Sequence, residues 1–189
     1  MRAYFFGNYY LSQIQQGIQG LHAVVELFTQ AESFTSRISV VDLPQTIRDQ
    51  ITMLYDWATN HKTVVFLNGG NQADLQELDA FLSTGIYPTS RFYEDEKSLN
   101  NALTSVCVIL PEKIYEGAKI WQARTRHSEF EQDRRFQKWV SIDKTTAMEL
   151  REDGTLAIAK ETDLDGIQIT TYTEWERNLM EMLVTYRLA

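Results

Sequence analysis

Two segments of the sequence carry polar and aromatic side chains at spacings that suit a small-molecule binding site. The first lies at the start of an expected helix and comprises Asn8, Tyr9, Tyr10, Gln13, Gln15, Gln16 and Gln19, followed by His22. N–H groups at the start of a helix, together with the helix dipole, favour anionic ligands. His22 follows Gln19 by three residues and therefore shares its face of the helix. A solvated first turn with capping residues, and a hydrogen-bonded core histidine, would explain the same pattern without a ligand.

The second segment is the run Glu94-Asp95-Glu96-Lys97-Ser98-Leu99-Asn100-Asn101. It combines carboxylates, a cation, a hydroxyl group and two amides, which together could hold a polar ligand. A solvated charged loop has the same composition, and this interpretation stays open beside the first.

The common catalytic motifs are absent from the sequence. It contains no GxxxxGK[ST], GxGxxG or GxSxG, the motifs of phosphate-binding loops and of the nucleophile elbow. His22, His61 and His127 are far apart and lack metal-ligand spacing. Cys107 lies within an apolar run, which is typical of a buried core cysteine. We therefore expect no metal site and no cofactor.

Composition narrows the function classes further. The chain has 189 residues, 18 Lys and Arg against 26 Asp and Glu, and a formal net charge of -8. Nucleic-acid binding depends on basic residues, so this balance disfavours a nucleic-acid partner. No stretch is long and apolar enough for a membrane span or a signal peptide, and we expect a cytoplasmic protein with no membrane partner.

Alternating helical and strand patterns predict an α/β fold. Apolar runs at 3–6, 63–67, 88–93 and 105–110 indicate strands. Helical spacing follows Ser12, Pro44 and Asn71, and in the first of these helices the apolar positions are Ile14, Ile18, Leu21, Val24, Val25 and Phe28. The order β-α-α-β-α-β-β predicts a mixed β-sheet covered by helices in a domain over residues 1–115.

Residues 116–189 are expected to form a C-terminal extension of helix, β-hairpin and helix. The charged and aromatic stretch from Pro111 to Trp139 suggests helix. Asp153-Gly154 is typical of the tight turn of a hairpin. Thr173 and Glu176 have the spacing of a capping box at the start of the last helix.

The first 115 residues resemble the type II peptidyl-tRNA hydrolases, a family with a compact mixed sheet packed by helices. The first helix of that family carries a Gln-x-x-His-Ala signature, which matches Gln19-Gly20-Leu21-His22-Ala23. A later polar loop of the form Asp-Ala-Gly-Arg-Thr-Gln aligns with this chain without a gap. Glu94 then takes the place of the acidic residue, Lys97 that of Arg and Ser98 that of Thr.

The chain departs from the family where its chemistry is concentrated. The hydrolases carry lysines between the first strand and the first helix, and one of these is thought to be catalytic. This sequence has no Lys or Arg between Arg2 and Arg37. Ester cleavage needs stabilisation of an oxyanion, and a grip on tRNA needs basic groups. The resemblance therefore implies that this chain has the fold and the pocket of the family but lacks the residues for ester cleavage.

Three hypotheses follow from these observations. In the first, the protein is a non-catalytic binder of a small nucleotide-like ligand, as in a phage protein that sequesters a host immune signal such as a cyclic nucleotide or an ADP-ribose derivative. A base would stack on Tyr9 or Tyr10, and Lys97 and Ser98 would contact phosphate or ribose. The hydrogen-bonding side chains would be Asn8, Gln15, Gln19, Asn100 and Asn101.

In the second hypothesis the protein is a divergent peptidyl-tRNA hydrolase, in which Glu94, Ser98 and His22 act with a water molecule. The missing lysine would be replaced by Arg124, Arg126, Arg134 or Arg135. In the third, the Trp-bearing extension is an interaction module that binds another protein or its own copy. A homo-oligomer, a dimer or larger, is the expected assembly.

Overall fold

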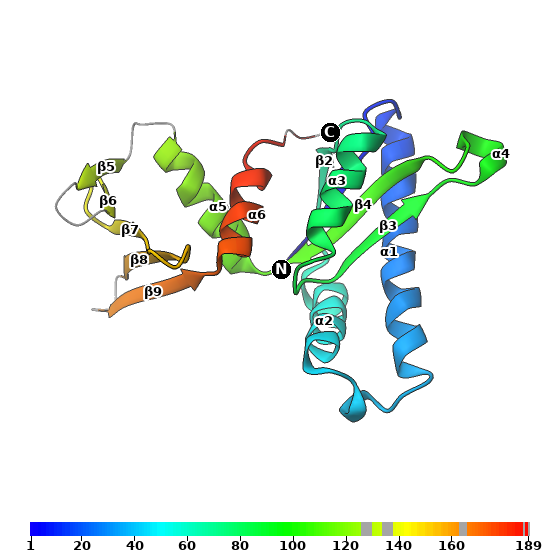
Figure 1. Cartoon of the computed structure of the whole chain (residues 1–189), viewed down its shortest axis with the longest axis horizontal. Coiled ribbons are helices and arrows are strands. Elements are labelled where there is room, and N and C mark those ends of the chain that lie inside the picture. The colour runs from blue at the N-terminus through cyan, green and yellow to red at the C-terminus, as the bar shows by residue number, and fades with distance from the viewer. Residues whose placement is uncertain (126–129, 134–137, 163–165, 187, 189) are drawn as a thin grey trace. The chain divides into compact units, whose positions relative to one another are not determined.

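A computed structural model describes residues 1–125, 130–133, 138–162, 166–186 and 188. The chain divides into two compact units (Figure 1). Unit 1 is Met1–Pro111 with Tyr186–Ala189, and unit 2 is Glu112–Thr185. No helix in the described ranges has the length and apolar character needed to cross a membrane.

Unit 1 is built on a mixed sheet, as the sequence predicts. Its strands are β1 (Arg2–Gly7), β2 (Val64–Asn68), β3 (Thr89–Tyr93) and β4 (Leu103–Leu110), in the order β2-β1-β4-β3. β1 and β2 are parallel, whereas β4 runs antiparallel to both of its neighbours, β1 and β3. Every residue of β4 is buried, which explains its nearly continuous apolar sequence.

Helices cover both faces of this sheet. The helices are α1 (Gln13–Thr35), α2 (Gln45–Asp56), α3 (Gln72–Leu82) and the single turn α4 (Glu96–Leu99), with a 3-10 turn at Val40–Asp42 and a π-helical turn at Trp57–His61. Ala3 and Phe5 face the core formed with α1 and α2. Phe6 points to the other face, which α3 covers. The layers are therefore helix, sheet and helix.

Local capping residues explain where the helices of unit 1 begin. The Ser12 side chain accepts from the backbone N–H of Gln15, and the Gln15 side chain accepts from Ser12, which completes a capping box. Asn71 and Asp74 form the same arrangement at α3. Ser12 is therefore the N-terminal cap of α1.

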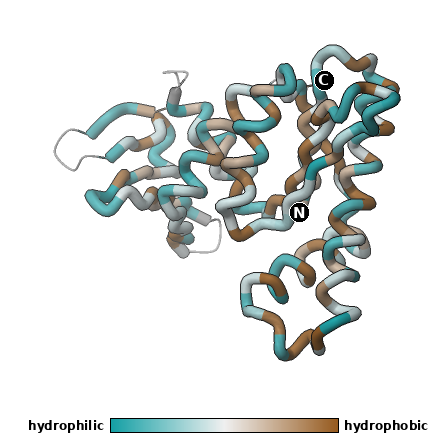
Figure 2. Tube along the Cα trace, turned by 45° about the vertical axis from the view of Figure 1, so that its right-hand side comes forward, coloured by the Kyte–Doolittle hydropathy of each residue, from teal (hydrophilic) through white to brown (hydrophobic). Residues whose placement is uncertain are grey.

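The face of α1 that packs on the sheet is not the face that carries most of its large apolar side chains. Its buried residues are Gln16, Gln19, Gly20, Ala23, Leu27 and Ala31. We define the apolar stripe of α1 as Ile14, Ile18, Leu21 and Val25. These side chains are exposed instead, with exposed fractions of 79% for Ile14 and 63% for Leu21. Figure 2 traces the helices and strands and colours each residue by its hydropathy.

Close packing explains this reversal. A β-carbon at Gly20 would lie 2.7 Å from the Phe66 ring and 3.0 Å from that of Phe5. At Gly20 the helix rests so closely on these two rings that even a methyl group would not fit without a shift of the rings.

The last described residues of the chain belong to unit 1. The ring of Tyr186 packs edge-on against Phe6, with centroids 4.8 Å apart. Leu188 forms an isolated β-bridge with Leu67 of β2. Unit 2 therefore lies between two segments of unit 1 along the chain.

Unit 2 consists of two helices and an antiparallel sheet. Its elements are α5 (Glu112–Thr125), β5 (Phe130–Asp133), β6 (Lys138–Ser141), β7 (Thr146–Leu150), β8 (Leu156–Thr162), β9 (Gly166–Tyr172) and α6 (Glu174–Leu183). The five strands pair in sequence order. The division of the chain at Glu112 coincides with the start of α5, so the boundary expected after residue 115 falls inside this helix.

The structure confirms the hairpin and corrects what surrounds it. β7 and β8 are joined by a turn in which Gly154 has a φ of 81°. The Asp153 carboxylate accepts hydrogen bonds from the N–H and the hydroxyl of Thr155, and these bonds lower the Asp153 pKa. The helix expected as far as Trp139 is wrong, because Phe130 and Trp139 lie in strands β5 and β6.

An arginine between two indole rings links α5 to this sheet. The guanidinium of Arg124 lies 4.0 Å from the ring centroid of Trp121 and 4.1 Å from that of Trp139. Burial between the rings lowers the pKa of Arg124. Such cation–π contacts stabilise a packed arginine without a carboxylate partner.

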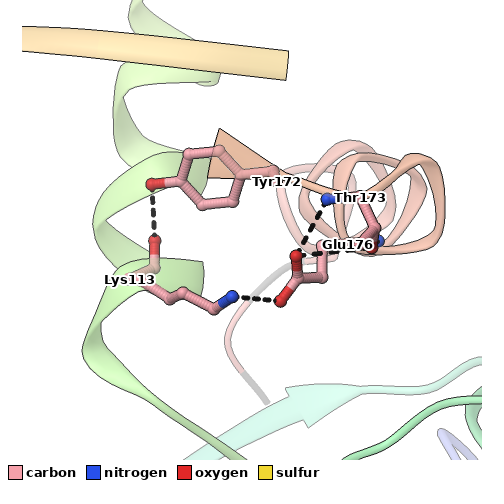
Figure 3. Close-up of polar contacts among 4 residues, drawn as sticks. All are labelled: Lys113, Tyr172, Thr173 and Glu176. Carbon is pink, nitrogen blue, oxygen red and sulfur yellow. Dashed lines mark hydrogen bonds and ion pairs between the residues drawn. The ribbon is translucent and has the colours of Figure 1, made fainter. Parts of the chain in front are cut away.

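A buried carboxylate joins α5 to α6 (Figure 3). Glu176 is 2% exposed, and its Oε1 lies 2.5 Å from Lys113 Nζ. Its Oε2 accepts from the backbone N–H of Thr173, which completes the predicted capping box. The Tyr172 hydroxyl donates to the Lys113 carbonyl at 3.0 Å, and burial raises the Tyr172 pKa to about 12. The Glu176 carboxylate thus forms an ion pair with α5 and also completes the N-terminal cap of α6.

We expect Lys113→Met to lower the free energy of unfolding of unit 2 by about 1.5–3 kcal/mol, because the buried Glu176 loses its charged partner. Urea unfolding followed by tryptophan fluorescence measures this, since Trp121, Trp139 and Trp175 belong to unit 2.

Lys119→Met is the matched control on the same helix. Its ion pair with Glu116 is solvent-exposed, so the change should stay below about 0.5 kcal/mol. Equal effects of the two substitutions would contradict a structural role for the Lys113–Glu176 pair.

Candidate functional site

The candidate site lies at the carboxyl ends of the two parallel strands. β1 ends at Gly7 and β2 at Asn68, which are paired in the sheet. Ligands of open α/β sheets bind outside the carboxyl ends of parallel strands. Asn8, the first residue beyond β1, is buried here, and its N–H donates to the Thr104 carbonyl at 3.0 Å. The polar residues that follow β1 are therefore fixed against β4.

A three-residue network forms the centre of the site. Gln19 Nε2 donates to Glu94 Oε1 at 2.6 Å. Thr104 Oγ1 lies 3.1 Å from Gln19 Oε1 and 3.2 Å from the Phe92 carbonyl, so its one proton is available to either acceptor. Both ends of the Gln19 amide are engaged, and its orientation toward Glu94 is fixed.

The backbone around Glu94 is fixed as well. Glu94 follows β3, and its N–H donates to the Ala102 carbonyl at 3.0 Å, so this bond joins the two residues that flank the 95–101 loop. Ser90 Oγ of β3 donates to the Ala23 carbonyl of α1 at 2.6 Å. Two segments far apart in the sequence are thereby held in contact.

Two buried polar atoms near this network lack partners in the described part of the chain. They are Gln16 Oε1 and Ser105 Oγ. Ser105 is paired with Gly7, and the Gln16 side chain packs 3.0 Å from where a Gly7 β-carbon would lie. Gln16 Nε2 donates to the carbonyls of Asn8 and Leu11, which settles which end of its amide is the oxygen. An acceptor and a hydroxyl group without partners thus both lie next to Gly7.

His22 lies on the surface beside the network. Its ring stacks on Phe92 of β3, with centroids 4.5 Å apart and 16° between the planes. The ring is exposed, so the alternative of a buried core histidine is wrong. One ring face packs on the protein while the ring edge is accessible to water.

The rings of Tyr9 and Tyr10 contact each other, tilted by 33°, in the segment that follows Asn8. Their ring centroids are 4.0 Å apart, and Tyr10 is 75% exposed. The Tyr10 N–H donates to Asn8 Oδ1 at 3.1 Å, and the Tyr9 N–H donates to the Gly70 carbonyl at 2.9 Å. A hydrogen bond with Tyr10 raises the Tyr9 pKa. The pair is a fixed aromatic surface that water reaches.

The charged segment after β3 is partly helical. Asp95 caps α4 by accepting from the Ser98 N–H at 2.7 Å, and this bond lowers the Asp95 pKa. Asn100 and Asn101 have φ of 53° and 56°, the left-handed conformation that asparagine tolerates well. Lys97 lies on the exposed turn of α4 between these points.

The structure brings together some of the predicted residues more closely than others. Asn8, Gln19 and Glu94 belong to one hydrogen-bonded assembly, and Tyr9 and Tyr10 adjoin it. Lys97, Ser98, Asn100 and Asn101 lie on the exposed turn that follows Glu94. Gln15 is exposed, and its Oε1 is used by the capping box, accepting from the Ser12 N–H at 2.9 Å.

Thr104 and Ser105 are buried polar residues that sequence reasoning missed, whereas the buried Gln16 belongs to the first polar segment of the sequence. The available signal was a pair of hydroxyl residues, Thr104 and Ser105, inside an otherwise apolar strand. A polar group in such a position needs a partner, so the pair indicates a polar environment on that part of the sheet.

Comparison with models of known protein families and with curated proteins finds no match for the chain. Among the described residues, no three His, Cys, Asp or Glu side chains gather where they could hold a metal ion. Cys107 is fully buried, and burial raises the pKa of its thiol. The chemistry of the site therefore comes from amides, hydroxyls, one carboxylate and exposed rings.

We expect Thr104→Val to lower the free energy of unfolding by about 1–3 kcal/mol, because it keeps the side-chain shape but leaves Gln19 Oε1 buried without a donor. Chemical denaturation measures the change.

Ser105→Ala, one position along β4, is the control. It removes a buried hydroxyl that has no partner among the described residues, so stability should stay the same or rise. A larger loss for Ser105→Ala than for Thr104→Val would contradict the network.

Proposed function

We propose that this protein binds a small nucleotide-like ligand at the Gln19–Glu94 site and does not catalyse a reaction there. The observation that carries the proposal is the hydrogen bond of 2.6 Å between Gln19 and Glu94. It joins the two segments that resemble the type II peptidyl-tRNA hydrolases, in a unit with a mixed sheet packed by helices. The resemblance supports that fold for residues 1–115.

The groups at the site match the parts of a nucleotide. Gln19 occupies Oε1 of Glu94, and a ribose hydroxyl would donate to Oε2, as it does to acidic residues in other nucleotide sites. The exposed ring of Tyr10 offers a stacking surface for a base. Lys97, three residues beyond Glu94, supplies the positive charge for a phosphate group.

The lack of cations argues against catalysis of ester cleavage. A developing oxyanion needs hydrogen-bond donors or positive charge, and the stretch Ala3–Ser36 holds neither Lys nor Arg. In a phage-encoded protein, such a site would serve to sequester a nucleotide signal of host immunity, such as a cyclic nucleotide or an ADP-ribose derivative.

A divergent peptidyl-tRNA hydrolase is the second candidate function. One observation favours it: Gln19 holds Glu94 through Oε1, which leaves Oε2 to act as a base toward water, with Ser98 or His22 assisting. The cation it requires is harder to supply. Arg124 is held between two indole rings within unit 2, and Arg126, Arg134 and Arg135 lie outside the described residues.

Isothermal titration calorimetry against cyclic dinucleotides, cyclic ADP-ribose isomers and NAD tests the binding proposal. We expect at least one of them to bind, and Lys97→Ala to weaken that binding by about 1.5–3 kcal/mol, the scale of a hydrogen bond to a charged group. Arg37→Ala is the control, because it removes the same charge from the loop beyond the far end of α1. No heat from any of these compounds with the folded protein, or equal affinity for Lys97→Ala and wild type, would contradict the proposal.

Incubation with purified peptidyl-tRNA separates the two candidates. We expect no release of peptide beyond the uncatalysed rate, because the segment between β1 and α1, where the hydrolases carry lysines, holds no Lys or Arg to stabilise the oxyanion. Multiple turnovers that Glu94→Gln abolishes would establish the hydrolase instead.

A further inference from the structure

The apolar stripe of α1 gathers four exposed hydrophobic side chains on one face of a single helix. They are among the nineteen large hydrophobic residues that are exposed in the described part of the chain. Ile14, Ile18, Leu21 and Val25 point away from the sheet, since the opposite face of α1 is the packed one. A contiguous apolar patch of this kind marks an interaction surface.

The spacing within the stripe indicates the shape of its partner. Ile14, Ile18, Leu21 and Val25 follow intervals of four, three and four residues, and Phe28 continues the pattern after three more. This is the repeat of 3.5 residues with which two α-helices interlock along a shared seam. Phe28 is half-buried against Tyr55, so the free seam ends there. The stripe therefore fits another helix.

Charge indicates which helix that is. The stretch from Ala3 to Val25 contains no Asp, Glu, Lys or Arg, in a chain with a net charge of -8. Two copies repel each other over most of their surfaces, and an uncharged face is where they can approach. A partner of opposite charge would be recognised through acidic side chains, which this face lacks.

Gly17 adds a separate observation on the same face. It lies one turn before Leu21 inside the helix, where glycine costs about 0.5–1 kcal/mol relative to alanine. A β-carbon at Gly17 would meet no atom within 4 Å, so packing within the chain does not require glycine there. Small residues on a helix face let a second helix come close.

We propose that α1 of one copy packs against α1 of a second copy through the apolar stripe, which produces a symmetric dimer. A two-fold axis lets the same patch serve both partners. Gln19 faces the sheet, on the side of α1 away from this contact, so each copy keeps its own binding site. The dimer is thus independent of the proposed ligand, and either can fail without the other.

Sedimentation equilibrium over a range of protein concentrations tests the dimer. The wild-type chain is expected at twice its mass of 21.9 kDa, and Ile18→Glu/Leu21→Glu at 21.9 kDa. The matched control is Ile86→Glu/Ile142→Glu, which adds the same charge at other exposed isoleucines and should remain dimeric. Circular dichroism confirms that each variant is folded.

Gly17→Glu sharpens the test because it favours the isolated helix. Glu is a better helix former than Gly and meets open space here, so the monomer should be at least as stable as wild type. The dimer should nevertheless dissociate, because a charge enters the seam. Wild-type protein that stays monomeric at every concentration, or a dimer that survives Ile18→Glu/Leu21→Glu, would overturn the proposal. The second result would place the contact elsewhere, as in the Trp-bearing unit 2.

Discussion

The close approach of α1 to the sheet at Gly20 is the constraint on which the rest of unit 1 depends. With a β-carbon site only 2.7 Å from the Phe66 ring, the helix rests directly on aromatic side chains. Glycine fits at this point of closest approach, and the rest of the buried face of α1 consists of Gln16, Gln19, Ala23, Leu27 and Ala31. Space, not hydropathy, decides which way the helix faces.

The buried amides of α1 require hydrogen-bond partners, which come from β4, from the segment after β1 and from the residue after β3. An amide that is removed from water without hydrogen-bond partners costs about 1–3 kcal/mol according to mutational data. Thr104 and Glu94 supply those partners for Gln19, and the carbonyls of Asn8 and Leu11 accept from Gln16 Nε2, whereas Gln16 Oε1 has no partner among the described residues. The polar site and the exposed apolar seam are therefore two consequences of the same packing.

The sequence predicted those features that depend on local chemistry. The buried strand β4 and the caps at Ser12 and Thr173 follow from residues within a few positions of each other. The packed face of α1 depends on Phe66, distant in the chain. β5 and β9 are largely polar or exposed and gain their strand form by pairing with neighbours. Gln19 and Glu94 belong to the two polar segments that the sequence singles out, whereas Thr104 does not, because its contact with Gln19 exists only in the folded chain.

The return of the chain to unit 1 through Tyr186 and Leu188 has a consequence for how the protein can be divided. The contacts with Phe6 and Leu67 complete the packing at β1 and β2. A fragment cut after Pro111 would remove the Tyr186 ring that packs on Phe6 and the backbone pairing of β2 at Leu67. Unit 2 is topologically an insertion, tethered at both of its ends to the same body. A minimal version of unit 1 therefore needs a linker that joins Pro111 to Tyr186 in place of a simple truncation.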